Sequence, residues 1–223
     1  MGISKTNGLV RIAMAEDDLS ILQLVSKHID TLENCKVVIK TAEGQELLDK
    51  LKENPGVEIV ILDIVMDGLD GYNTAAILRK EYPEIKILFY SVCKTELALM
   101  RMVACGGHGL VKKGNGTEHF KKGIKTLLKG NYYYPDGETG YTNFANGSSG
   151  DILSKPTLLS ALELTFLQYA ITELTYKQIA YKMDKELRQV DYIREGLFKK
   201  LQVQSRVGLA ILALQSGIMP KQV

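Results

Sequence analysis

Apolar runs alternate with amphipathic stretches through the first 130 residues of the chain. Short runs such as VEIVILD (57–63) and IKILFYS (85–91) are almost continuously apolar, and the stretches between them repeat their apolar residues with a helical period. This pattern predicts five strands and five helices. Strands that alternate with helices favour a parallel sheet covered by helices on both faces. We therefore expect residues 1–130 to form an α/β domain with a five-stranded, flavodoxin-like sheet of order 2-1-3-4-5.

The pattern changes after residue 130. Residues 131–152 are rich in Gly, Asn, Ser and Tyr and are predicted to be a linker. Residues 153–223 show only helical periodicity, and they are predicted to form an all-α domain of four helices. A short helix, a tight turn and a longer amphipathic helix within it indicate a helix-turn-helix. Two capping boxes are expected to open the first two helices, Ser160 with Glu163 and Thr175 with Gln178.

The composition of the chain argues against a membrane-spanning protein and against a zinc or redox site. Hydrophobic residues make up 45% of the chain and charged residues 24%, and the net charge is +2. Because no apolar run has the length of a membrane span, we expect a cytoplasmic protein with no membrane partner. The three cysteines and three histidines lack the spacing of a zinc or redox site.

Acidic residues follow two of the predicted strands. Glu16, Asp17 and Asp18 come directly after the first strand, and Asp63 comes directly after the third. Ligands of open parallel sheets bind beyond the carboxyl ends of the strands where the strand order reverses, and the first and third strands flank that point. Converging carboxylates raise one another's pKa unless a cation joins them. Mg²⁺ suits such a site because it takes oxygen ligands while it also binds phosphate.

Two further groups are expected at the same edge of the sheet. The fourth strand ends at the hydroxyl of Ser91, and the fifth ends at Lys112 and Lys113. A lysine ammonium is a point charge suited to phosphate. Carboxylates, a cation, a hydroxyl and an ammonium together indicate a site that receives a phosphoryl group on a carboxylate.

These residues, in this order, resemble the receiver domain of two-component response regulators. The resemblance covers residues 9–130 and rests on the acids of AEDD, on DIVMDGLDG, on Ser91 and on GLVKK. Residues 156–218 resemble a LuxR-type helix-turn-helix domain, as in the NarL/FixJ class of response regulators. The resemblance implies a phosphoacceptor regulator that catalyses only its own phosphoryl transfer and dephosphorylation.

The resemblance also implies a role for each site residue. Asp63 would accept the phosphoryl group from a sensor histidine kinase, and Ser91 would be the switch hydroxyl. Lys113 would pair with the phosphate, since its spacing from Ser91 matches that of the family; Lys112 is the alternative. The Mg²⁺ ligands would be three carboxylates and one backbone carbonyl, those of Glu16, Asp17, Asp63 and Val65.

The chain departs from the receiver pattern at two positions. Asp67 stands where the family usually has proline, and it adds a negative charge to the loop after the third strand. Leu110 stands where the family usually has an aromatic residue that moves with the switch hydroxyl. The second departure puts the usual form of signal transmission in doubt, although not phosphorylation itself.

The helix-turn-helix departs from its family where it would meet DNA. Its recognition helix is expected at residues 186–201, and it carries Asp191 and Ile193 where basic contacts are usual. Glu173 stands where glycine is common before the second helix. The recognition helix is close to neutral, and phosphate contacts dominate DNA affinity, so a monomer should bind weakly. The candidate contacts to double-stranded DNA are Lys177, Arg188, Gln189, Tyr192 and Lys199.

Two functions remain open at this point. The first is a transcription regulator that phosphorylation converts into a DNA-binding homodimer. The second is a phosphorylation-dependent adaptor whose C-terminal helices bind protein, which Asp191, Ile193 and Glu195 motivate. A phosphatase of the haloacid-dehalogenase kind would need a second aspartate where Val65 stands. Asp63 could also be a strand-end charge, and the acids after the first strand could serve only the N-terminus of a helix.

Overall fold

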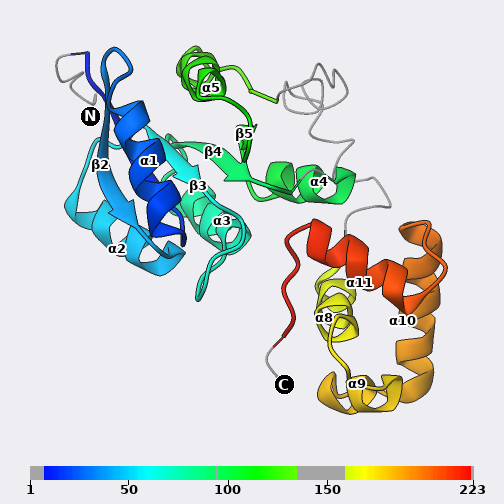
Figure 1. The fold of residues 1–223 in the computed structure, drawn as a ribbon. Coiled ribbons are helices and arrows are strands. Elements are labelled where there is room, and N and C mark those ends of the chain that lie inside the picture. Colours follow the sequence, from blue (N-terminus) through cyan, green and yellow to red (C-terminus); the bar gives the residue numbers. More distant parts are fainter. Residues whose placement is uncertain (1–7, 94, 135–158, 222–223) are drawn as a thin grey trace. The chain divides into compact units, whose positions relative to one another are not determined.

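The structure is a computed structural model that describes residues 8–93, 95–134 and 159–221. Up to Tyr134 strands and helices alternate, as the sequence predicts (Figure 1). The strands are β1 (Val10–Ala15), β2 (Cys35–Thr41), β3 (Ile59–Leu62), β4 (Lys86–Ser91) and β5 (Gly109–Lys112). The helices between and after them are α1 (Leu19–Ile29), α2 (Gly44–Glu53), α3 (Gly71–Glu81), α4 (Glu96–Ala104) and α5 (Glu118–Leu128).

The five strands form one parallel sheet in the order β2-β1-β3-β4-β5, which confirms the predicted topology. Every residue of the central strand β3 is buried, as expected for a strand covered on both faces. The edge strand β2 instead alternates buried residues with exposed Lys36 and Lys40. Charged side chains of this kind protect a sheet edge from pairing with other chains.

Helices α1 and α5 cover one face of the sheet. Their apolar residues share a core with alternate residues of the strands, among them Met14, Ile61 and Tyr90. On the opposite face Phe89 of β4 packs against Tyr72 of α3, with ring centroids 6.0 Å apart. The alternation of side chains along each strand therefore sends neighbouring residues to different layers.

The segment after α5 packs along the free edge of β5. The Leu110 N–H donates to the Tyr133 carbonyl at 2.8 Å, and the Tyr133 N–H donates to the His108 carbonyl at 3.0 Å. Tyr134 is buried beside them. These tyrosines are the first residues of the predicted linker, and residues 135–152 of it lie outside the described part of the chain. The predicted domain boundaries therefore stay a prediction.

The C-terminal residues form helices α8 (Ala161–Ala170), α9 (Tyr176–Lys182), α10 (Leu187–Lys200) and α11 (Arg206–Gln215). Both predicted capping boxes are present, at Ser160 and at Thr175. Apolar residues of the four helices meet in one core that includes Phe166, Ile179, Val190, Leu197 and Leu209. Among the residues that the structure describes, none of the helices is long and apolar enough to cross a membrane.

The loop between β3 and α3 requires a glycine at its end. The Gly71 N–H donates to the Ile64 carbonyl at 2.9 Å and closes the loop directly behind Asp63. A Cβ atom at Gly71 would collide with the carbonyl oxygen of Asp63 and would lie 2.8 Å from Cα of Ile64. Both of these are backbone atoms, so no side-chain rotation relieves the contact.

We expect Gly71→Ala to destabilise the N-terminal unit by about 1–3 kcal/mol, as overpacked sites do. The better helix propensity of alanine recovers at most about 1 kcal/mol of this. The measurement is urea unfolding followed by the amide NMR signals of β3. Gly116→Ala is the control because no heavy atom lies within 4 Å of its Cβ position. Equal midpoints for the two variants would show that the loop does not need glycine at Gly71.

Candidate functional site

The register of the sheet brings the candidate residues to one edge. Ala15 at the end of β1 pairs with Leu62 at the end of β3. The Asp63 N–H extends this ladder by donating to the Ala15 carbonyl at 3.0 Å, so Glu16 and Asp63 follow neighbouring strand ends. The Lys113 N–H likewise donates to the carbonyl of Ser91 at 3.0 Å. Each of these side chains stands at or just past the carboxyl end of its strand.

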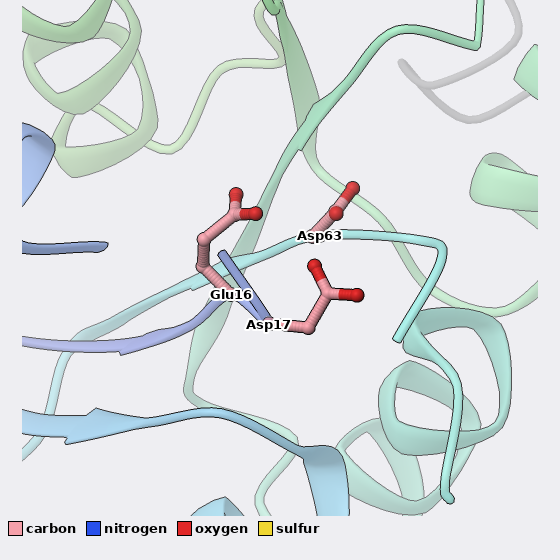
Figure 2. Close-up of side chains that lie close together, drawn as sticks. All are labelled: Glu16, Asp17 and Asp63. Atoms are coloured by element: carbon pink, nitrogen blue, oxygen red, sulfur yellow. The ribbon is translucent and has the colours of Figure 1, made fainter. Parts of the chain in front are cut away.

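Three of the predicted acids form a cluster. Ligand atoms of Glu16, Asp17 and Asp63 all lie within 4.8 Å of one another (Figure 2). Glu16 is fully buried at 0% exposure and Asp63 is 4% exposed, whereas Asp17 is exposed. The fourth acid of this region has a different place: Asp18 caps α1 by accepting from the Ser20 and Ile21 N–H groups. The cluster therefore consists of two buried acids and one exposed acid.

Lys113 is the lysine that reaches the buried acids. Its Nζ lies 2.8 Å from Oε1 of Glu16 and 2.8 Å from Oδ2 of Asp63, and its side chain is 15% exposed. Lys112 is the last residue of β5 and pairs in the sheet with Ser91. The structure thus brings together Glu16, Asp17, Asp63 and Lys113, while the role of each residue stays a prediction.

Burial and charge shift the pKa values of this group. Burial raises the pKa of Glu16 to about 7, with a further contribution from the charge of Asp63, and the hydrogen bond from Lys113 opposes both. Burial also raises the pKa of Asp63, against hydrogen bonds from Lys113 and from the Ile64 N–H. Burial alone would lower the pKa of Lys113, but its bonds to the two carboxylates outweigh that effect and raise it. Lys113 is therefore held in its charged form.

One buried carboxylate oxygen in this cluster has the chemistry of a cation ligand. Among the described residues, Oε2 of Glu16 is one of the few buried side-chain atoms without a hydrogen-bond partner. An unpaired oxygen of a buried carboxylate is costly to desolvate. A hard cation such as Mg²⁺ takes oxygen ligands from carboxylates, so the donor set of Glu16, Asp17 and Asp63 fits such an ion.

Other residues of the receiver motifs lie in β4, in β5 and in the loop after β3. Ser91 is 1% exposed at the end of β4. Val65 lies partly exposed in the loop after β3, and Asp67 is exposed in the same loop. Leu110, which stands where the receiver family usually has an aromatic residue, is fully buried in β5. Asp70 caps α3 by accepting from the Asn73 N–H, so its carboxylate serves the helix.

An aromatic residue that the sequence did not single out adjoins the site. Nζ of Lys113 lies 5.5 Å from the ring centroid of Tyr90. Burial raises the pKa of Tyr90, and the nearby charge of Lys113 opposes that shift. The position of Tyr90 depends on how β4 and β5 align, and the sequence of either strand alone does not give that alignment.

In the C-terminal unit all five candidate DNA contacts are exposed. Lys177 lies in α9, and the other four lie in α10. Tyr192 is 80% exposed, which is unusual for an aromatic residue without a partner surface. Oε1 of Gln189 accepts from the Glu186 N–H at 3.0 Å and closes the start of α10, which leaves the Nε2 amide as its donor. Tyr181 of α9 is a further exposed aromatic residue that the sequence analysis missed.

Several basic residues of this unit are already engaged in the fold. Arg194 pairs with Asp191 at 2.8 Å and lies over the ring of Tyr176. Lys200 pairs with Glu163 at 2.9 Å. Arg206 donates to the carbonyls that end α8, those of Ala170 and Thr172. The positive charge that α10 can offer to DNA is therefore smaller than its basic residues suggest.

Comparison with known families agrees with the two-part fold. Residues 12–125 match the family described as the response regulator receiver domain. Residues 157–213 match the luxR family of bacterial regulatory proteins. The fold and the site thus define a phosphoacceptor regulator rather than a conventional enzyme. The chain belongs to the response regulator receiver family, and it is a two-component response regulator with a LuxR-type output domain.

Relatives of this architecture match nearly the whole chain. The response regulator GacA of Pseudomonas viridiflava is 24% identical over 217 residues, which cover 95% of this chain and 98% of GacA. The Fimbriae Z protein of Escherichia coli K12 is 27% identical over 191 residues, covering 86% and 88% of the two chains.

Solved structures share the fold. RcsB from Salmonella enterica serovar Typhimurium, bound to promoter rprA in the presence of the phosphomimetic BeF3-, has a TM-score of 0.65 at 18% identity. That comparison covers 92% of this chain and 98% of the RcsB chain. A structure of two RcsB dimers bound to two parallel DNAs has a TM-score of 0.59 at 19% identity, and covers 93% and 98% of the two chains.

Proposed function

We propose that Asp63 accepts a phosphoryl group from a sensor histidine kinase in the cytoplasm. The observation that carries the proposal is the bond of Lys113 to both Glu16 and Asp63 at a buried sheet edge. The Ile64 N–H donates to Oδ1 of Asp63 at 2.7 Å, and Lys113 donates to Oδ2, so the carboxylate is held in one orientation. A fixed nucleophile lowers the entropic barrier to phosphoryl transfer.

The transfer forms one bond and breaks one. An oxygen of Asp63 bonds to phosphorus while the bond from phosphorus to the phosphohistidine nitrogen breaks, and the product is an acyl phosphate. Lys113 is placed to pair with the new phosphoryl oxygens, because it already contacts Asp63. Ser91, buried at the same edge, is proposed as the switch hydroxyl.

The same cluster is proposed to hold Mg²⁺. Its ligands would be carboxylate oxygens of Glu16, Asp17 and Asp63, with the backbone carbonyl of Val65 as a fourth. When bound, the ion supplies positive charge that neutralises the phosphoryl oxygens. The unpartnered Oε2 of Glu16 supports this assignment.

We further propose that phosphorylation favours a homodimer whose two α10 helices bind half-sites on double-stranded DNA. The exposed set that supports it is Lys177, Arg188, Gln189, Tyr192 and Lys199. Two linked modules on adjacent half-sites combine their binding free energies, so a dimer compensates for the small charge of each helix. The RcsB–DNA structures, which share the fold, provide the precedent for the arrangement.

Phosphorylation of Asp63 is tested with acetyl phosphate and Mg²⁺. We expect the intact protein to gain the mass of one phosphoryl group and Asp63→Asn to gain none, because the amide is a poor nucleophile. The control is Asp67→Asn, which removes a charge from the same loop at an exposed residue. A wild-type protein that gains no mass would refute the proposal.

Magnesium binding is tested by calorimetric titration. Asp17→Asn removes one proposed ligand, and we expect it to weaken Mg²⁺ binding at least about tenfold, a loss of roughly 1.4 kcal/mol. Asp18→Asn is the matched control, because it removes the same charge one residue away and asparagine still caps a helix. Equal losses in both variants would mean that general charge, rather than ligation, attracts the ion.

DNA binding is tested by selection from random duplexes with phosphorylated protein, followed by affinity measurements over a range of salt concentrations. For the selected site, Lys177→Ala with Lys199→Ala should reduce the slope of log affinity against log salt by roughly 2. Lys27→Ala with Lys80→Ala, which removes the same two charges from exposed residues of α1 and α3, serves as the control. If no sequence is enriched, the adaptor function is favoured instead.

A further inference from the structure

Tyr90 separates the charged site from the apolar core. It is 9% exposed and belongs to the core cluster beneath α1 and α5. Its ring centroid lies 5.5 Å from Nζ of Lys113, within the range of cation–π contacts. The residue therefore touches both the ammonium of the site and the hydrocarbon interior of the sheet.

The alternation of the strands explains this position. Met14, Ile61, Tyr90 and Val111 all contribute to the core under α1 and α5. Two residues beyond three of these come Glu16, Asp63 and Lys113, which continue the same face of the sheet past the strand ends. Tyr90 is thus on the layer that carries the two buried acids and the partly buried Lys113.

A second ring fixes the ring of Tyr90. Phe120 of α5 lies with its ring centroid 4.9 Å from that of Tyr90, at an interplanar angle of 55°. Phe120 is itself 2% exposed. Tilted aromatic pairs at this separation are attractive. The ring beside Lys113 is therefore held in place by the packing of α5.

The ring of Tyr90 gives the ammonium of Lys113 a further contact beside its two carboxylate partners. A lysine ammonium has three N–H donors, and Lys113 directs one toward Oε1 of Glu16 and one toward Oδ2 of Asp63. The long stem of lysine is flexible, so two bonds do not by themselves restrict it to one rotamer. The electron-rich face of a ring attracts a cation and favours the rotamer that stays beside it.

We propose that Tyr90 is a positioning residue, which holds the ammonium of Lys113 at the phosphoryl site through the face of its ring. The inference rests on the proposed phosphorylation of Asp63. Leu110 of β5 stands where the receiver family usually has an aromatic residue. It is buried and aliphatic, so it offers no ring face to the ammonium. In this chain the aromatic ring beside the site therefore comes from Tyr90 of β4, and Phe120 of α5 packs against it.

The test compares three variants of the full chain with acetyl phosphate and Mg²⁺. Tyr90→Leu removes the ring, and we expect its maximal phosphorylation rate to fall roughly three- to thirtyfold, the span of cation–π energies. The half-saturating donor concentration should not change, because Tyr90 is buried and is proposed to act only through Lys113. Tyr90→Phe keeps the ring and should retain the wild-type rate to within about twofold.

Phe89→Leu is the matched control. Phe89 is the preceding residue on β4, it is fully buried, and it packs against Tyr72 on the opposite face of the sheet. Its loss should lower the melting temperature at least as much as the loss of Tyr90, without slowing phosphorylation. If the phosphorylation rate falls equally in Tyr90→Leu and Phe89→Leu, general destabilisation explains the loss and the inference is overturned.

The NMR chemical shift of the Lys113 side chain reports its distance from the ring and does not depend on the stability of the fold. Because Nζ lies beside the ring of Tyr90, we expect the Hε signals of Lys113 to be shifted upfield in the wild type and in Tyr90→Phe, and not in Tyr90→Leu. If the wild type accepts phosphoryl groups while Tyr90→Leu matches it in rate and in the Lys113 shift, the positioning role is wrong. If the wild type accepts none, the proposed function itself fails.

Discussion

The burial of two carboxylates and one ammonium at the end of a parallel sheet is the constraint on which the receiver site depends. Glu16 and Asp63 are almost completely removed from water, and Lys113 contacts both. A buried charge without a partner is strongly destabilising, so the three groups stay together or change together. Under the proposed function, a phosphoryl group on Asp63 would add charge beside Lys113 and would change its contacts with the two carboxylates.

The C-terminal unit uses its charges in the opposite way. Arg194, Lys200 and Arg206 bind carboxylates, carbonyls or an aromatic ring and thereby join the helices to one another. They stabilise the helix-turn-helix and leave α10 with a small net positive charge for DNA. Under the proposed function, pairing two such domains on DNA would compensate for the small charge of each.

Much of the fold was predictable because the hydrophobic period of an element and the residues that cap or end it are local properties of the sequence. The continuous apolar runs of β3 and β4 identified buried central strands, and the capping boxes at Ser160 and Thr175 marked helix starts that the structure confirms. The acids after β1 and β3 were predictable as a cluster, since the strand order places those strand ends side by side. Tyr90 and the tyrosines along β5 were not predictable, because their contacts depend on the register between strands and on packing by α5.

The sequence by itself determined the order of the elements, the topology of the sheet, and the residue types available at its carboxyl edge. These follow from hydrophobic period, turn residues and the position of charges at strand ends. Only the tertiary structure decided that Lys113 bridges Glu16 and Asp63 and that Arg194 is engaged by Asp191. Some of these pairs join residues far apart in the chain, and others select one of several nearby residues with the same chemistry. In both cases only the packed geometry shows which pair forms.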